Sequence, residues 1–571
     1  MPGMEFPFKT QKHMFSNPPQ SQSPFRKGGG GGLWPFLLVA AFAFLLYLNS
    51  LGNGFVRDDL EQVVNNGWIR GPGSIPEIFS SHMWGFNRLH SSNYYRPFIH
   101  LIYMAAYFLF GPAPWGFHLV NVLFHSMMSG LVFLTAREVL GEPDRRGFFS
   151  APLITPIIAP VMAGLLFASH PIHTEAVDWI SAVSELSFSF FFLLSFYLYI
   201  RSGKGEFKKG LYACSLISFA VSVLCKETGL LLPFVLFIYD YAVKRRRPLA
   251  LKKYLPYLAV IIAYLAVRSL ALKGIMPAQS DERMAELGTF GYLINAFYLF
   301  VKYMEKLLLP VNLNGYYTDF IRSLSEPRGY ISLALSLLFL LFSFIAYKKE
   351  RKVFFCLAFM VLTLLPALYI RALYGTTFAE RYLYLPSFAF VLLFAILLKW
   401  AANAKAKAAL YAGFLILVSL YSVGTIGRNP VWKDNVSFWR DNAMKSPGSD
   451  YVRTVLGFAL LNAGRLDEAE SELLAALRLN PDNHDAHCHL GAIYGMKDLN
   501  EAAIRELLIA RSLDPVCPDT RYNLGIAYAK TGDLHKAIEE FKAALKLDPY
   551  FEEAKEGLAA AYRDAGLRDG R

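Results

Sequence analysis

The chain has 571 residues, of which 54% are hydrophobic, 15% aromatic and only 18% charged, and its mean hydropathy is +0.32. These values exclude a wholly soluble globular protein and instead indicate several membrane spans. The formal net charge of +12 would suit nucleic-acid binding. However, most Lys and Arg residues form short clusters between apolar runs, which is typical of cytoplasmic membrane loops, so we expect no nucleic-acid partner.

The N-terminal part of the chain begins with a polar tail and continues into a series of apolar runs. Residues 1–32 are rich in Pro, Ser, Gly and Lys, which predicts a disordered cytoplasmic tail. The run at 33–51 is too long for an ordinary signal peptide and lacks a cleavage site, so we interpret it as an uncleaved first span. If every basic cluster is cytoplasmic, the chain crosses the membrane about eleven times and places its C-terminal part outside. The expected spans cover residues 33–51, 116–136, 152–169, 184–200, 211–225, 228–243, 254–272, 330–347, 353–370, 384–399 and 408–427.

Two further apolar stretches do not fit this count. Residues 97–110 are too short to cross easily, and residues 292–309 carry several charges. Inserting either one as a span would move the next basic cluster to the outer side. We therefore expect both to be interfacial helices on the outer surface. The alternative, that residues 292–309 form a twelfth span, stays open at this point.

The last part of the chain has a repeating sequence. Pro447, Pro481, Pro515 and Pro549 are 34 residues apart, and glycine recurs at the same interval at residues 457, 491 and 525. This period, with small residues where paired helices touch, predicts tetratricopeptide repeats. We divide the chain into a tail at 1–32, a transmembrane domain at 33–428, a linker at 429–447, and three repeats with a C-terminal capping helix at 448–571.

Charged and polar side chains gather at the predicted outer ends of the spans, where their burial in a bilayer would be costly without a reason. Each group also has an ordinary structural explanation. The acidic pair could be solvated or cap a helix, the histidines could be hydrogen-bonded interface residues, Lys226 and Glu227 could form a local ion pair, and Arg381 could anchor to lipid headgroups. The candidates from four loops are Asp58, Asp59, Arg96, His170, His173, Glu175, Trp179, Lys226, Glu227, Glu380 and Arg381.

These loops also carry a family resemblance. The motifs are Phe55 with Asp58-Asp59, Tyr95-Arg96-Pro97, the run His170 to Glu175, Lys226-Glu227-Thr228, and the run Arg381 to Pro386. In this order, and followed by the repeats, they resemble the transmembrane and tetratricopeptide-repeat-containing O-mannosyltransferases and their bacterial relatives, over residues 33 to 566. More distantly, the chain is similar to protein O-mannosyltransferases and lipid A aminoarabinose transferases. Three repeats is a short array beside the eukaryotic members, which favours a bacterial protein.

The resemblance implies an all-α membrane helix bundle of the GT-C type and a polyprenyl-phosphate sugar as donor. It also implies an essential acidic residue in the first outer loop. Developing charge on the donor phosphate requires cations, for which we select Arg96, Lys226 and Arg381. A carboxylate must take a proton from the acceptor hydroxyl, and Asp58 or Asp59 is the candidate base. The remaining substrate-binding candidates are His170, His173, Glu175, Trp179, Glu227 and Glu380.

Together these features predict a membrane glycosyltransferase that acts on the extracytoplasmic face of a bacterial inner membrane. The acceptor would be a hydroxyl group, expected on Ser or Thr of a protein that the repeats hold. The alternative is a non-catalytic scaffold whose repeats assemble an envelope or polysaccharide-export complex. Carboxylates and histidines could ligate a divalent metal, but no spacing in the sequence demands one. Sequence does not determine the sugar, the acceptor, the stereochemistry or the pairing of Cys488 with Cys517.

Overall fold

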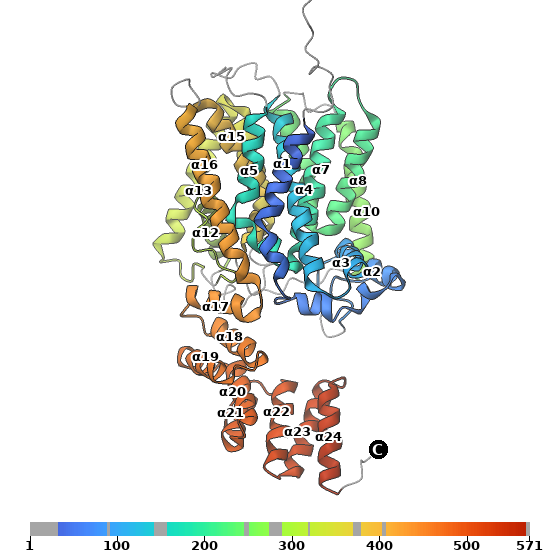
Figure 1. Ribbon diagram of the computed structural model, residues 1–571, viewed down its shortest axis with the longest axis vertical. Coiled ribbons are helices and arrows are strands. Elements are labelled where there is room, and N and C mark those ends of the chain that lie inside the picture. The colour runs from blue at the N-terminus through green and yellow to red at the C-terminus, as the bar shows by residue number, and fades with distance from the viewer. Residues whose placement is uncertain are drawn as a thin grey trace, which may run out of the picture.

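The computed structural model describes residues 32–87, 92–141, 157–244, 251–272, 288–317, 320–368, 378–401 and 407–566. These residues form helices joined by turns, without a β-strand among them, so the all-α prediction is confirmed for this part of the chain. A helix bundle occupies one end of the molecule and the repeats extend from its other end (Figure 1). Residues 1–31 of the predicted tail and parts of three basic clusters lie outside the described residues.

Each of the eleven predicted spans coincides with a helix of the bundle. Five stretches within the described residues are long and apolar enough to cross a membrane: Pro114–Leu140, Ile180–Ser202, Pro327–Lys349, Arg351–Leu368 and Ala408–Trp432. They support a membrane protein, while the crossing of the shorter helices stays a prediction. The eleven helices are α1 (Leu33–Leu46), α4 (Pro114–Leu140), α5 (Ile158–Ser169), α7 (Val183–Ser202), α8 (Lys209–Cys225), α9 (Leu232–Ala242), α10 (Leu255–Ala271), α13 (Pro327–Lys349), α14 (Arg351–Leu368), α15 (Pro386–Ala401) and α16 (Lys407–Arg428).

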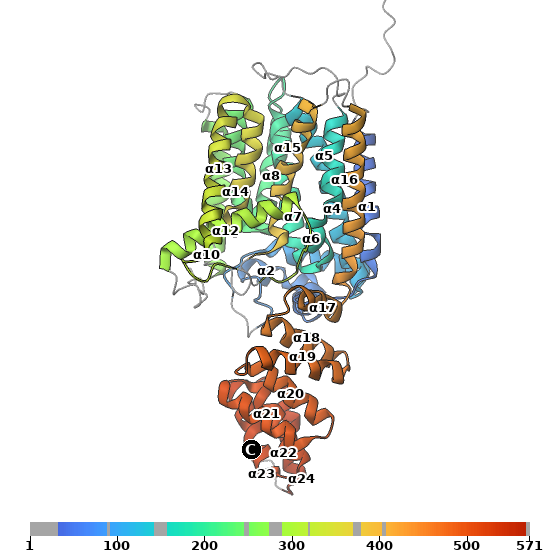
Figure 2. The ribbon, with the colours of Figure 1, turned by 90° about the vertical axis from the view of Figure 1, so that its left-hand side faces the viewer.

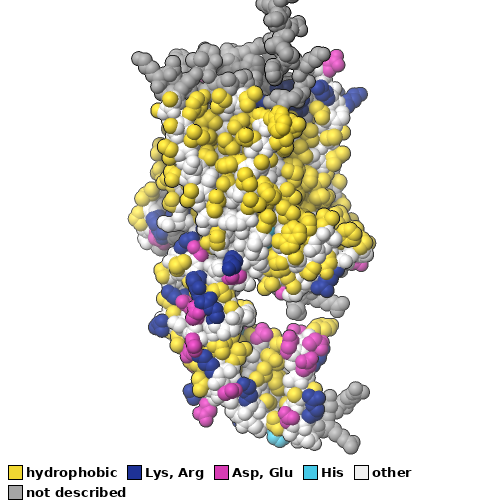
Figure 3. Space-filling view, in the orientation of Figure 1, with side chains coloured by type: hydrophobic (Ala, Val, Ile, Leu, Met, Phe, Trp, Pro, Cys, Tyr) yellow, Lys and Arg dark blue, Asp and Glu magenta, His cyan; other side chains and the backbone are white. Residues whose placement is uncertain are grey.

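The surface of the bundle is apolar in the way that lipid contact requires. Figure 3 shows hydrophobic side chains covering the bundle in that view, whereas Lys, Arg, Asp and Glu gather over the repeats. On α13, for example, Leu337, Leu338, Leu340 and Leu341 are each more than half exposed. A water-soluble protein rarely exposes so large an apolar surface.

Three helices at the repeat end do not run along the bundle. The short α2 (Ile75–Ser80) and α3 (Pro97–Phe110) lie together at this end (Figure 1). The third, α12 (Gly288–Leu308), runs obliquely across the lower part of the bundle (Figure 2). Both stretches that we expected to be interfacial are thus helices outside the long-axis set, which favours the interfacial interpretation over a twelfth span.

The C-terminal helices form stacked pairs. The pairs are α18 (Asp450–Asn462) with α19 (Leu466–Leu479), α20 (His484–Met496) with α21 (Asn500–Leu513), and α22 (Pro518–Lys530) with α23 (Leu534–Leu547), followed by α24 (Glu552–Asp564). A Cβ atom built on Gly457, Gly491 or Gly525 would lie only 2.5 to 2.7 Å from a side chain of the paired helix. Close helix contact therefore explains the repeated glycine, and the predicted repeat fold is confirmed.

Residues 429–447, predicted as a linker, have a defined structure. They contain the 3-10 helix η12 (Asn429–Trp432) and helix α17 (Asn435–Lys445). Trp432, Phe438 and Trp439 from this segment are buried in one cluster with Val56 and Trp179 of the bundle. The same cluster continues into α18 and α19, so a hydrophobic core joins the bundle to the first repeat.

Candidate active site

The two adjacent aspartates of the first outer loop have different environments. Asp59 is fully buried, and its Oδ1 accepts hydrogen bonds from the backbone N–H of Ser181 (2.8 Å) and from its hydroxyl (2.5 Å). Its Oδ2 accepts a third bond from the N–H of Val56 at 3.0 Å. Burial raises the pKa of Asp59 to about 7, against the opposing effect of the Ser181 and Val56 hydrogen bonds. Asp59 therefore joins the loop to the turn at Ser181, just before α7.

Asp58 instead faces open space. It is half-buried and lines a cavity of about 150 Å³, which we call the smaller cavity. Within the part of the chain that the structure describes, its carboxylate has no hydrogen-bond or ion-pair partner. The other walls of the smaller cavity come from three more loops, through Trp179, Lys226 and Arg381.

A second, larger cavity of about 480 Å³ adjoins the first. Both cavities are lined by the same five residues, which therefore lie at their junction: Tyr94, Arg96, Glu185, Lys226 and Tyr382. Beyond this junction the walls of the larger cavity are mainly apolar, with side chains from α7, η8 (Glu227–Leu231), α14 and the start of α15. The two cavities together connect a carboxylate, a set of cations and an apolar groove between membrane helices.

Each cation that we predicted at the site is paired with a carboxylate. Arg96 bonds to Glu227 at 2.9 Å, Lys226 pairs with Glu185, and Arg381 pairs with Glu175. Burial acts to raise the pKa of Glu227, but the Arg96 guanidinium, a backbone hydrogen bond and the Lys226 charge together lower this pKa below its ordinary value. Burial lowers the pKa of Lys226, and Glu185 opposes that shift.

Glu175 and Trp179 hold Arg381 from two directions. Glu175 is fully buried, and besides the ion pair it accepts the backbone N–H of Arg381 at 2.9 Å. The ring of Trp179 lies 5.0 Å from the Arg381 guanidinium, in cation–π contact. Trp179 lines the smaller cavity, whereas Glu175 lies behind Arg381 and lines neither cavity.

The two histidines that we predicted as substrate ligands lie away from both cavities. His170 Nδ1 accepts the backbone N–H of Ile172 (3.2 Å), so Nε2 carries the proton and donates to the Leu307 carbonyl (3.0 Å). His173 Nε2 lies 2.8 Å from the hydroxyl of Ser387, which itself donates to a carbonyl. Burial lowers the pKa of both imidazoles, that of His170 to about 4, so both are neutral near pH 7. In this structure they fix the turn after α5.

Glu380 also lies outside the two cavities. It is fully buried and pairs with Arg428 of α16 at 3.0 Å. It also accepts bonds from the backbone N–H of Asn314 (2.6 Å) and from the Tyr317 hydroxyl (2.5 Å). Glu380 therefore connects three outer segments.

Several cavity residues were not among our predicted site residues. Glu185, Tyr94 and Tyr382 lie at the junction, and Arg268 of α10 lines the larger cavity, where it donates to the Asn93 carbonyl at 2.8 Å. A signal for Arg268 was present, because an arginine near the end of an apolar run needs a functional or structural reason. Tyr382 lies within the motif Arg381 to Pro386, and Tyr94 directly precedes the motif Tyr95-Arg96-Pro97.

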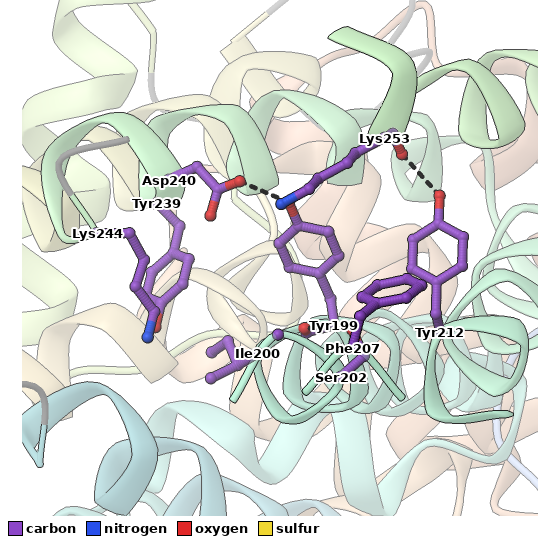
Figure 4. Close-up of a pocket in the computed structure, with 10 residues that line it drawn as sticks. Tyr199, Ile200, Ser202, Phe207, Tyr212, Tyr239, Asp240, Lys244 and Lys253 are labelled. Carbon is purple, nitrogen blue, oxygen red and sulfur yellow. Dashed lines mark hydrogen bonds between the residues drawn. The ribbon is translucent and has the colours of Figure 1, made fainter. Parts of the chain in front are cut away.

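A further cavity lies at the opposite end of the bundle, where α7 ends and α8 begins. Its volume is only about 10 Å³, which is room for about one water molecule. Figure 4 shows its polar lining, in which the Tyr199 hydroxyl donates to Asp240 at 2.6 Å and the Tyr212 hydroxyl to the Lys253 carbonyl at 2.7 Å. A sugar or phosphate group does not fit there.

A metal ion that is held by protein side chains alone needs several His, Cys, Asp or Glu side chains close together. Among the described residues no group of three or more such side chains could hold a metal ion. Glu185, Glu227 and Glu175 are each engaged with a cation.

Comparison with known proteins supports the expected relationship. Models of the tetratricopeptide repeat match residues 457–498 and 518–551. Protein O-mannosyl-transferase F38B6.6 of Caenorhabditis elegans is 27% identical over 470 residues, which cover 81% of this chain and 65% of the relative. Human protein O-mannosyl-transferase TMTC3 is 26% identical over 512 residues, covering 81% of this chain and 53% of the relative. Among solved structures, MamA matches 24% of this chain and 78% of its own at 28% identity, with a TM-score of 0.22.

The match to the mannosyltransferases extends over both the bundle and the repeats, although the chain spans only about half to two thirds of these relatives' lengths. Over about four fifths of its length the chain is therefore homologous to the transmembrane and tetratricopeptide-repeat-containing (TMTC) protein O-mannosyl-transferases.

Proposed function

We propose that the protein is a membrane glycosyltransferase that moves mannose from a polyprenyl-phosphate donor to a hydroxyl group of a protein acceptor on the extracytoplasmic face. The observation that carries this proposal is the junction of the two cavities. Asp58 lies on one side of it, and Arg96 and Lys226 lie between Asp58 and the apolar groove. The names of the relatives support the mannosyl group and the protein acceptor.

The larger cavity suits the donor. A polyprenyl phosphate has a long apolar chain and one anionic group, so it needs an apolar groove that ends at cations. Here the apolar walls meet Arg96, Lys226 and Arg268. When the sugar leaves, negative charge grows on the phosphate, and fixed cations in a partly dry site stabilise that charge more than water would.

The smaller cavity suits the acceptor hydroxyl. Asp58, without a partner of its own, would take the hydroxyl proton as the oxygen attacks the anomeric carbon. The bond from that carbon to the phosphate oxygen breaks with its electron pair, and the lipid phosphate leaves unprotonated. One carboxylate is sufficient for this displacement, which would invert the anomeric centre. Trp179 and Arg381 would contact the sugar or the acceptor from the opposite wall.

The test is sugar transfer by Asp58→Asn in the full-length protein. We expect transfer to fall by roughly 10² to 10⁴-fold, the usual contribution of a general base, with normal membrane insertion. The assay follows labelled mannose from undecaprenyl-phosphate mannose into envelope proteins of a host that lacks this gene. Glu61→Gln is a matched control, because Glu61 is in the same loop but its carboxylate bonds to Asn65 and Asn87. Full transfer by Asp58→Asn would support a scaffold instead.

A further inference from the structure

The segment between the bundle and the repeats is bound directly to the loop that carries Asp58. We call residues 429–445, with η12 and α17, the neck. The N–H of Gly54 donates to the carbonyl of Lys433 at 2.8 Å, and the side chain of Asn53 donates to the carbonyl of Asn429 at 3.1 Å. A Cβ atom on Gly54 would lie 3.2 Å from the Lys433 carbonyl oxygen, so loop and neck are in close backbone contact.

The contact is strongest at the residue before Asp58. Arg57 has a φ of +56°, in the left-handed region that a side chain as large as arginine seldom occupies. Its backbone N–H donates to the side-chain oxygen of Asn435, the first residue of α17, at 2.9 Å. Its guanidinium lies over the rings of Phe438 and Trp439 of the same helix, at 5.4 and 5.8 Å.

The backbone angles of Arg57 set the direction in which the chain enters Asp58. Such a conformation persists only where the surroundings hold it, and at Arg57 the surroundings are mostly the neck. If Asn435 released the N–H, the loop could relax and move the carboxylate of Asp58. A displacement of about 1 Å is enough to slow a reaction about 100-fold.

The neck also supports the opposite wall of the smaller cavity. Trp432 stacks on Trp179 with ring centres 6.2 Å apart and planes 19° apart. The guanidinium groups of Arg381 and Arg57 in turn lie 5.0 and 4.9 Å from the centre of the Trp179 ring. Arg57 and Trp179, which contact the neck, therefore help to position Asp58 and Arg381 respectively.

The repeats are continuous with this support. Trp439 and Tyr451, at the start of α18, share the ring of Tyr316 at 5.9 and 4.9 Å. Arg440 of α17 bonds to Glu468 of α19 at 2.9 Å. A displacement of the first repeat would therefore be transmitted to α17 through packed aromatic rings and an ion pair.

We propose that the neck is a positioning element for the reaction, in which Asn435 holds Arg57 in its left-handed conformation and so aims the Asp58 carboxylate at the acceptor. The repeats would then be coupled to the chemistry and would not act only as a tether for the acceptor. This inference rests on the proposed function, because it gives Asp58 the role of base.

The test compares Asn435→Ala with Asn435→Asp in the purified full-length protein. Alanine removes the acceptor of the Arg57 N–H, whereas aspartate keeps an oxygen there and suits a helix N-terminus. With undecaprenyl-phosphate mannose as donor and envelope proteins of a deficient host as acceptors, turnover is expressed per donor-binding site. We expect Asn435→Ala to lower kcat about tenfold or more, with donor KM and donor-binding stoichiometry unchanged. We expect Asn435→Asp to recover kcat to within about threefold.

Two further variants separate positioning from folding. Met444→Ala is the control on the same helix, because Met444 is 71% exposed, and its kcat should not change. Arg57→Gln tests the contact from the loop side and should lower kcat in the same way, with little added loss in the double variant with Asn435→Ala. The inference would be overturned if Asn435→Ala lost donor-binding sites while its kcat per site stayed normal. It would also be overturned if Asn435→Asp did not recover activity. A normal kcat for Asn435→Ala would also overturn the inference about the neck. In that case an inactive Asp58→Asn would still support the proposed function.

Discussion

At the scale of single residues, the outer loops show how neighbours in sequence acquire different roles. Asp58 and Asp59 are adjacent, yet Asp59 points into the protein and accepts three hydrogen bonds, whereas Asp58 points into a cavity. Each charged group at the cavity junction has a partner of opposite sign. Asp58, which lines the smaller cavity without such a partner among the described residues, is therefore the carboxylate to which we assign the role of base.

The raised pKa of Asp59 predicts a specific pH dependence of stability. In the folded protein Asp59 holds its proton up to about pH 7, whereas an ordinary aspartate loses it near 3.8. Between these values the folded state binds more protons, so stability falls as pH rises and then becomes constant above about pH 7. The loss from pH 5 to 8 should be about 2 to 3 kcal/mol, since one pKa unit corresponds to about 1.4 kcal/mol.

The measurement is the melting temperature of the detergent-solubilised protein and of Asp59→Asn between pH 5 and 8. Asparagine does not titrate, and it places an amide group opposite the Val56 N–H, so it should be less stable at pH 5. The advantage of the natural protein over Asp59→Asn should shrink towards pH 8. A constant difference across this range would show that Asp59 is ionised throughout.

At the scale of elements, patterns among neighbouring residues predicted most helices. A helix that depends on contacts distant in sequence was not predicted. The apolar runs and the 34-residue period depend on nearby residues, and the structure has helices at all of them. Helix α17 was missed because its eleven residues are held by Val56 and Trp179, which are far away in sequence. The ion pairs Arg96–Glu227 and Arg381–Glu175 join residues 131 and 206 positions apart. All four residues were predicted site residues, but nothing in the sequence indicated which of them would form ion pairs with each other.

The turn η8 shows the same dependence on close packing. Gly229 is buried in this turn, and a Cβ atom there would lie 3.0 Å from the backbone carbon of Ser222 and from the nitrogen of Val223. Because backbone atoms of α8 cannot move aside easily, Gly229→Ala should push η8 outward, together with Lys226 and Glu227. We expect a stability loss of about 1 to 3 kcal/mol and weaker donor binding.

Gly210→Ala is the matched control for this prediction. Gly210 lies near the start of α8, and a Cβ atom there would meet nothing within 4 Å. Alanine should be tolerated there or slightly stabilising. Thermal melting would measure the stability of each variant, and titration with labelled donor would measure its donor affinity. Equal stability and equal donor affinity of the two variants would show that η8 is not tightly packed on α8.

At the scale of the whole molecule, the orientation of the chain decides whether the proposed site can meet secreted proteins. Helix α1 begins at the end of the bundle opposite the repeats, and α16 ends at the repeat side (Figures 1 and 2). The chain therefore passes from one end of the bundle to the other an odd number of times. Since basic loops are retained in the cytoplasm, the end with Arg201, Lys204 and Lys209 should be inside, and Asp58 and the repeats outside.

Reporter fusions to the full-length chain test this orientation. Alkaline phosphatase fused after residue 571 should be active and green fluorescent protein at the same place dark, because phosphatase needs an oxidising compartment to fold. Fusions after Gly205, in the loop between α7 and α8, should give the opposite pattern. A cytoplasmic C-terminus would mean that the whole bundle is inserted in the opposite orientation. It would place Asp58, Arg96 and Lys226 inside the cell, and the donor would then have to be presented on the cytoplasmic face.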